Sequence, residues 1–151
     1  MNRTHGLLHS LSAENRERIL ALSREVSFPA GERIFEEGGR AEHFWIIRTG
    51  AVYLDLHVPG RRAPTVEALG PGDLLGWSWL FAPYRWHLGA QALSPVRARE
   101  FDAEQVRALC EEDPVLGREL VLACAEVIAH RLTASRTRLL DLYGPHSAVR
   151  S

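Results

Sequence analysis

The sequence predicts a single, mainly β domain with flanking helices, folded as a sandwich or barrel. Three observations support this prediction. From Phe28 to about residue 101 the chain consists of short apolar runs separated by turn residues, which indicates about seven or eight strands. The segments before and after this region have apolar residues at helical spacing. With 151 residues, of which 46% are hydrophobic and 25% charged, the chain has the size and composition of one folded domain.

The strand region contains one strong turn signal. Thr49-Gly50 lies between "FWIIR" and "AVYLDL", two runs that are rich in aromatic and β-branched residues. A short turn with glycine between two such runs predicts a tight hairpin. Many short strands with glycine-rich turns favour a closed β architecture.

The expected helices lie at the two ends of the chain. "SLSAENRERILALSREV" predicts one short helix, with Ser10 or Ser12 as its N-cap. Asp102 is placed to cap the segment "AEQVRALCEE". Asp113 is followed by proline, which favours the first position of a helix, so a long helix is expected from about Pro114 to Tyr143.

The long helix has an apolar seam at heptad spacing. Its positions are Val121, Ala125, Ile128, Leu132, Ser135, Leu139 and Leu142. The seam either packs on the chain's own strands or pairs with a second copy. A helix of thirty residues is about 45 Å long, which exceeds one small barrel and favours a homodimer through this helix.

Charge and cysteine content exclude several classes of protein. All 18 basic residues are arginine, and 19 acidic residues bring the formal net charge to -1, so no global field attracts nucleic acid. Cys110 and Cys124 match neither a C-x-x-C motif nor a secreted disulfide framework, which favours a reduced cytoplasmic location. The sequence shows no signal peptide and no apolar run of membrane-spanning length, so export and membrane insertion are not expected.

Four stretches with glycine carry a resemblance to a known family. They are "PAGE" at 29–32, the Gly38-Gly39 turn, "IIRTGAV" at 46–52 and "GPGDLLG" at 70–76. Over roughly residues 7 to 143 the chain resembles the cyclic nucleotide-binding domain of the catabolite activator and FNR-like regulators. The resemblance implies one domain over 1–151, with a β jelly roll at about 24–101 and C-terminal helices at about 103–143.

In that family the segment after Gly76 is a phosphate-binding cassette. The resemblance implies a short helix whose N-terminal amides face a cyclic phosphate, a glutamate that holds the ribose hydroxyl, and an arginine that neutralises the phosphate. Here Trp77 stands in the place of the glutamate, and an indole donates one hydrogen bond and accepts none. The position of the arginine falls near Trp86 or His87, one or two residues after Arg85.

The candidate ligand-binding residues therefore surround the cassette. They are Leu75, Gly76, Trp77, Ser78, Arg85, Trp86 and His87, together with Ser135, which falls near the place where the family presents hydroxyls to the base across the dimer. The aromatic residues either line a pocket or fill it as core. In the first case the chain is a ligand-sensing regulatory domain for cAMP, cGMP or another small aromatic ligand, and it signals through a dimer to an unidentified protein partner. In the second it is a structural or interaction module without a ligand.

Other chemistry finds little support in the sequence. A metal-binding jelly roll needs clustered histidines, and no His-x-His occurs, so no metal site is expected. Hydrolase, zinc-protease and nucleotide-loop motifs do not occur, so we do not expect an enzyme. The family's regulators usually have a helix-turn-helix after the long helix, and the residues from Gly144 to Ser151 are too few to form one, so DNA is not an expected partner.

Overall fold

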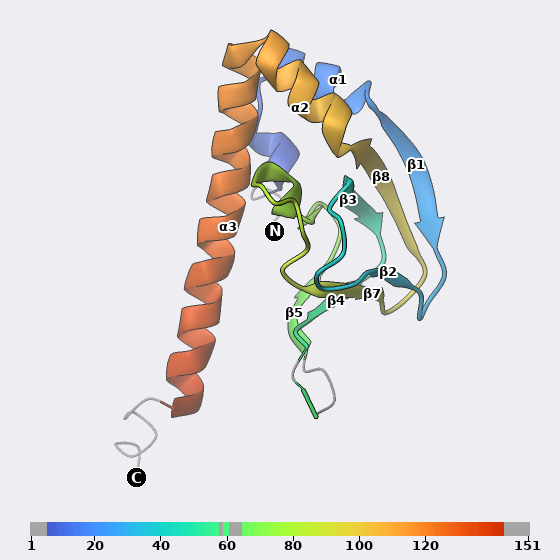
Figure 1. The fold of residues 1–151 in the computed structure, drawn as a ribbon, viewed down its shortest axis with the longest axis vertical. Coiled ribbons are helices and arrows are strands. Elements are labelled where there is room, and N and C mark those ends of the chain that lie inside the picture. The colour runs from blue at the N-terminus through green and yellow to red at the C-terminus, as the bar shows by residue number, and fades with distance from the viewer. Residues whose placement is uncertain (1–5, 58, 61–64, 144–151) are drawn as a thin grey trace.

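The computed structural model describes residues 6–57, 59–60 and 65–143. Two four-stranded antiparallel sheets form a sandwich, with short helices at one end and a long helix along one side (Figure 1). The first sheet has the order β1 (Ser23–Phe28), β8 (Val96–Asp102), β3 (His43–Thr49), β6 (Leu74–Leu75). The second has the order β2 (Arg33–Phe35), β7 (Gly89–Ala92), β4 (Val52–Asp55), β5 (Thr65–Leu69).

The predicted fold class is confirmed: a mainly β jelly roll with flanking helices is followed by a long C-terminal helix. The predicted hairpin at Thr49-Gly50 is wrong, because β3 and β4 belong to different sheets. Gly50 has a φ of 95°, and a Cβ atom there would lie 2.3 Å from the carbonyl oxygen of Pro95. The glycine therefore lets the chain cross from one sheet to the other against the turn before β8.

Each of the three described α-helices begins at a side-chain cap. Before α1 (Ala13–Leu20), the hydroxyl of Ser12 accepts a hydrogen bond from the Asn15 amide at 3.3 Å. Asp102 caps α2 (Ala103–Glu112) in the same way at 3.0 Å, and Asp113 caps α3 (Pro114–Tyr143) at 3.2 Å. α1 ends earlier than the sequence pattern suggested, because residues 23–28 pair with β8 as a strand. Two short 3-10 helices, η2 (Leu7–Ser10) and η3 (Ser78–Leu80), complete the fold.

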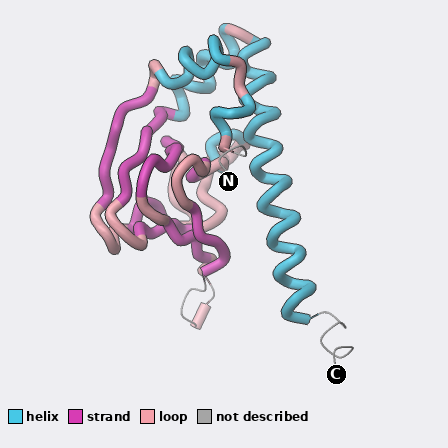
Figure 2. Tube along the Cα trace, turned by 180° about the vertical axis from the view of Figure 1, so that it is seen from behind, coloured by secondary structure: helices cyan, strands magenta, loops and turns pink. Residues whose placement is uncertain are grey.

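The long helix α3 buries one face and exposes another. Leu116, Leu120 and Cys124 are buried in the core, on the stripe that faces the rest of the chain. The heptad seam is mostly exposed, and the fractional exposure of Leu132 and Leu139 is 51% and 55%. Figure 2 shows α3 from behind, running along one side of the sandwich with its C-terminal end extending past the strands. The seam therefore does not pack on the strands of its own chain.

Within the part of the chain that the structure describes, no helix combines the length and the apolar character that crossing a bilayer requires.

Candidate functional site

The cassette begins at a glycine that no other residue could replace without strain. β6 pairs with β3 through Trp45 and Leu75, and the chain then turns at Gly76, where φ is 96°. A Cβ atom on Gly76 would lie 2.8 Å from the ring of Trp86. The turn therefore needs glycine both for its backbone conformation and for the space that the indole occupies.

Two of the predicted site residues, Trp86 and Leu75, belong to the hydrophobic core, and so does Trp79, which lies between them in sequence. The Trp86 ring is 6% exposed and stacks on Phe35 with 3.8 Å between ring centroids. Trp79, the middle residue of η3, is buried and stacks on Phe44 at 4.3 Å. Leu75 is fully buried as well. The aromatic residues of the cassette thus fill much of the space beneath it.

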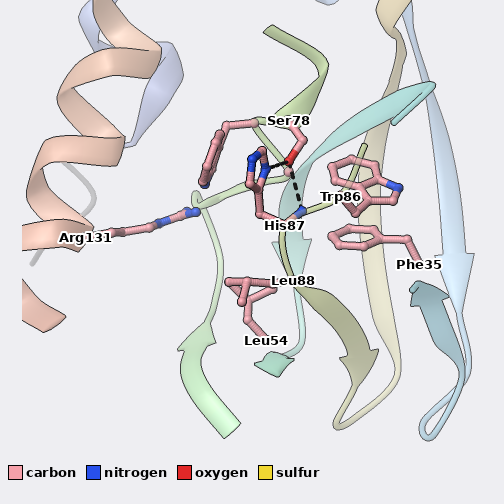
Figure 3. Close-up of a pocket in the computed structure, with 9 residues that line it drawn as sticks. Phe35, Leu54, Ser78, Trp86, His87, Leu88 and Arg131 are labelled. Atoms are coloured by element: carbon pink, nitrogen blue, oxygen red, sulfur yellow. Dashed lines mark hydrogen bonds between the residues drawn. The ribbon is translucent and has the colours of Figure 1, made fainter. Parts of the chain in front are cut away.

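Trp77, Ser78 and His87 form the rim of the same region. The Ser78 hydroxyl lies 2.8 Å from His87 Nδ1 and accepts a hydrogen bond from the His87 backbone amide at 3.3 Å. The Trp77 indole is half-buried and stacks on the His87 ring at 4.8 Å. Figure 3 shows the Ser78 and His87 side chains facing one another beside Trp86. The bend at His87 brings its ring to the cassette turn.

Arg131 reaches this region from α3 (Figure 3). Its side chain is 13% exposed, its Nη2 donates a hydrogen bond to the Leu74 carbonyl, and its Nε lies 3.5 Å from a carboxylate oxygen of Glu67. Burial lowers the pKa of the Arg131 guanidinium, although Glu67 opposes this effect. Burial also raises the pKa of Glu67. Nη1 of Arg131 is buried and has no hydrogen-bond partner among the described residues.

These side chains enclose what we call the cassette cleft. Its lining residues are Phe35, Leu54, Gly76, Trp77, Ser78, Trp86, His87, Leu88 and Arg131. The empty space between them is about 270 Å³, including the part open to solvent, and only about 20 Å³ is wide enough for a water molecule to move in. About 10–15 Å³ of such space holds one water molecule. The enclosed part of the cassette cleft therefore has room for about one water, and a ligand of few atoms would also occupy its open mouth.

Two of the predicted site residues lie away from the cassette cleft. Arg85 is exposed, donates a hydrogen bond to the Gly38 carbonyl at 3.3 Å, and lines a separate polar groove with Tyr84 and Arg107. In that groove the Arg107 guanidinium lies 4.2 Å from the centroid of the Tyr84 ring. Ser135 lies one helical turn beyond Arg131 and is not among the residues that line the cleft. The placement of Arg85 corrects the expectation that it supplies the positive charge of the pocket, because its short backbone segment pairs with Arg40 and directs the side chain elsewhere.

Arg131 is the site residue that the sequence analysis missed, although the sequence holds a signal for it. The buried stripe of α3 consists of Leu116, Leu120, Cys124 and Val127, and the next position at the same spacing is Arg131. A charged residue in an apolar stripe needs a partner or a function. The heptad seam lies on a different face of the same helix and does not include Arg131.

No group of three or more histidine, cysteine, aspartate or glutamate side chains in the described part of the chain is arranged to hold a metal ion. Cys110 and Cys124 are free thiols, and burial raises the pKa of Cys124 to about 12. The polar groups available for ligand binding in the cassette cleft are the serine, the histidine, the indole and the guanidinium.

A jelly roll with a short helix after a glycine turn and a long C-terminal helix defines a cyclic nucleotide-binding type of domain. The chain belongs to the cyclic nucleotide-binding domain family, which matches residues 25–113. A candidate cyclic nucleotide-binding protein from Geobacter metallireducens superposes with a TM-score of 0.75 at 31% identity, over 86% of this chain and 94% of that one. The catabolite activator protein of Thermus thermophilus superposes with a TM-score of 0.72 at 26% identity, over 90% of this chain and 62% of that one.

Curated relatives include two proteins named as regulators. The CRP-like cAMP-activated global transcriptional regulator of Mycobacterium tuberculosis is 29% identical over 127 residues, which cover 82% of this chain and 55% of the relative. The nitrogen fixation regulation protein FixK of Bradyrhizobium diazoefficiens is 28% identical over 146 residues, which cover 97% of this chain and 58% of the relative. The chain thus spans a little over half the length of these relatives.

Proposed function

We propose that this chain is a ligand-sensing regulatory domain whose ligand binds in the cassette cleft. The observation that carries the proposal is that Arg131 lines a mostly apolar cleft together with the hydrogen-bonded pair of His87 and Ser78. Such a cleft, with few polar groups at defined places, is typical of a small-molecule site. Membership of the cyclic nucleotide-binding domain family supports a sensor function, and the relatives named as regulators support a regulatory rather than an enzymatic one.

We also propose that the chain acts as a homodimer through α3 and passes its signal to a protein partner that is still to be identified. The support is the exposed apolar seam, which continues over about three heptads. Arg131 lies on the same helix and joins the cleft to it. A change at the cleft can therefore reach the proposed dimer interface through one side chain.

Cyclic AMP and cyclic GMP are expected to bind no more tightly than about millimolar. The cleft offers no carboxylate for a ribose hydroxyl among the residues that line it, Trp77 and Trp86 stand where the family's polar contacts fall, and the free space is narrower than a nucleotide. Each missing charge-assisted hydrogen bond costs about 1.5–3 kcal/mol. Isothermal titration calorimetry with both nucleotides tests this prediction, and a micromolar dissociation constant would contradict it.

The test of the proposed function is a thermal-denaturation screen with a panel of small metabolites. A compound that binds the native state raises the melting temperature, and the rise should increase with concentration. We expect at least one compound to do so in the wild-type chain and to lose much of its effect in Ser78→Ala. The matched control is Ser94→Ala, because Ser94 lies in the turn before β8, outside the cleft.

A module without a ligand is the second candidate, and a specific observation favours it. Trp79 and Trp86 fill the region beneath the cassette, so the space that remains is small. In that case no compound of the panel would change the melting temperature. The dimer and its protein partner would then account for the function alone.

Specific binding of duplex DNA by this chain is not proposed. The formal net charge of -1 leaves no overall attraction to phosphates. The residues from Gly144 to Ser151, considered above for a DNA-reading motif, lie outside the described residues. The cytoplasmic location expected from the sequence stays a prediction.

A further inference from the structure

Arg131 has a buried hydrogen-bond donor that is not paired within the described residues. A guanidinium has five N–H donors, and buried donors in native proteins are nearly always satisfied by protein, water or ligand. Here Nη2 donates to the Leu74 carbonyl and Nε faces Glu67, but Nη1 is buried without a partner among the described residues. The side chain lines the cassette cleft, so a ligand in the cleft is the natural acceptor for this donor.

The walls of the cleft indicate the charge of that ligand. None of the described residues that line it is acidic, and Arg131 brings a full positive charge. His87 Nδ1 is engaged by Ser78, which leaves Nε2 as the other polar atom of the ring. Glu67 already pairs with Arg131 Nε at 3.5 Å, but it is not among the residues that line the cleft, and Nη1 has no partner among the described residues. An anion in the cleft would therefore meet the free donor of Arg131 and no carboxylate on the wall.

The shape and the remaining lining indicate its size. Leu54, Leu88 and Phe35 give the cleft an apolar wall opposite the polar end. The empty space of about 270 Å³ includes the mouth that is open to solvent, and only about 20 Å³ of it is enclosed, so a carboxylate would take the enclosed part and a tail would lie in the mouth. Figure 3 shows Leu54 and Leu88 below the line along which Arg131 enters. The planar fork of a guanidinium matches a carboxylate, and a short alkyl chain would lie along the apolar wall.

We propose that the cassette cleft binds a small carboxylate with a short apolar tail, and that Arg131 is its anion-binding residue. The proposal rests on the proposed function, because it names the ligand class of the same cleft. It also gives the ligand a route to α3. The Arg131 guanidinium, which donates to the Leu74 carbonyl, would also donate to the ligand. Arg138, one heptad later, donates to the Val66 carbonyl, and this bond would be the same with and without ligand.

The probe is butyrate, and its neutral isostere butyramide is the matched comparison. We would follow the tryptophan indole signals of the isotope-labelled 151-residue chain by NMR, with Trp77→Phe to assign the Trp77 signal. Butyrate should move the Trp77 signal in a saturable way, with an affinity at least about tenfold higher than that of butyramide. Chloride at equal ionic strength should leave it unchanged. Equal affinity for butyrate and butyramide would overturn the proposal.

Two variants distinguish ligand binding by Arg131 from the hydrogen bonds that hold α3 to the strands. Arg131→Gln should abolish the response to butyrate, whereas Arg138→Gln, which removes the neighbouring tether and leaves the cleft intact, should retain it. If Arg131→Gln does not fold, the comparison of butyrate with butyramide on the wild-type chain decides. Inorganic phosphate should bind more weakly than butyrate, because it has no tail. Tighter phosphate binding would overturn the carboxylate assignment.

The outcome also distinguishes this inference from the proposed function. If a neutral compound moves the Trp77 signal and raises the melting temperature equally in the wild type and in Arg131→Gln, the cleft is a ligand site and the carboxylate proposal is wrong. If no compound does either, the proposed function itself fails.

Discussion

Single residues in the cassette divide into those that hold the fold and those that face the cleft. Trp86 and Trp77 are nine positions apart and both are aromatic, yet one is buried between Phe35 and Gly76 and the other is half-buried at the rim. The difference arises from their neighbours rather than from residue type. Trp86 meets the glycine turn of the cassette, whereas Trp77 stacks on a histidine that is itself exposed.

This difference predicts unequal losses of stability. Trp86→Ala should lower the free energy of unfolding by about 3–5 kcal/mol, because it removes a buried ring and leaves a cavity. Trp77→Ala should cost less than about 2 kcal/mol, because part of its ring is already in contact with water. Urea titrations of both variants would measure the difference. A smaller loss for Trp86→Ala than for Trp77→Ala would show that the core assignment is wrong.

At the scale of elements, α3 has two apolar faces. The inner face carries the buried stripe that ends at Arg131, and the outer face carries the exposed heptad seam. Because both faces are apolar, the helix has little net amphipathicity. A pattern that looks for one apolar stripe therefore identifies only one of the two faces. The tertiary structure separates them because the sandwich covers one side of the helix alone (Figures 1 and 2).

The outer face predicts the oligomeric state. Leu132→Asp combined with Leu139→Asp should convert a dimer into a monomer of 16.9 kDa, because each charge would be buried without a partner at the interface. Both positions are exposed in the single chain, so its fold should persist, which circular dichroism would check. Val115→Asp is the control, since Val115 is exposed on α3 but outside the seam. Light scattering that finds a monomer for the wild-type chain would exclude the proposed dimer.

At the scale of the whole molecule, ionic contacts join the start of the chain to α3. Glu119 accepts hydrogen bonds from the Asn15 side chain at 2.9 Å and from the Ser12 amide at 3.0 Å. These bonds lower the pKa of the Glu119 carboxyl below its ordinary value. The Arg18 guanidinium lies 2.5 Å from Asp113 and, together with the Leu116 amide, lowers the pKa of Asp113. The N-terminal helix is thus held by two carboxylates with lowered pKa values.

These contacts predict loss of stability in acid. A carboxyl whose pKa is lower in the folded state binds fewer protons there than in the unfolded chain, so its contribution is complete above the unfolded pKa and disappears as the pH falls through the folded one. The free energy of unfolding should therefore decrease below about pH 5. Urea midpoints between pH 7 and pH 3 would measure this. Glu119→Gln should weaken the dependence, and Glu111→Gln, at an exposed position of α2, should not. An unchanged dependence in Glu119→Gln would contradict the assignment.

Local sequence rules account for most of the elements. Aspartate caps at 102 and 113 and the proline at 114 set the starts of α2 and α3, because they act on backbone groups within three residues. The strand region follows from alternating burial and turn glycines. The family resemblance in the glycine stretches predicted the jelly roll and the position of the cassette. Most of those glycines have a positive φ, which other residues rarely adopt.

The tertiary structure alone decided which side chains meet at the cassette. Arg131 is 55 positions from Gly76 in sequence, and no local rule connects them. They are brought together because α3 packs beside β5 and β6, where Arg131 contacts Glu67 and the Leu74 carbonyl. Arg85 is near the cassette in sequence, yet the pairing of its segment with Arg40 turns it to another surface. Gly50 likewise lies between the two sheets, where the Pro95 carbonyl leaves no space for a side chain. This contact joins segments that are distant in sequence. The sequence by itself determined the elements and the fold, since these depend on local conformation and periodicity, whereas the composition of the cleft depends on contacts between segments that only folding brings together.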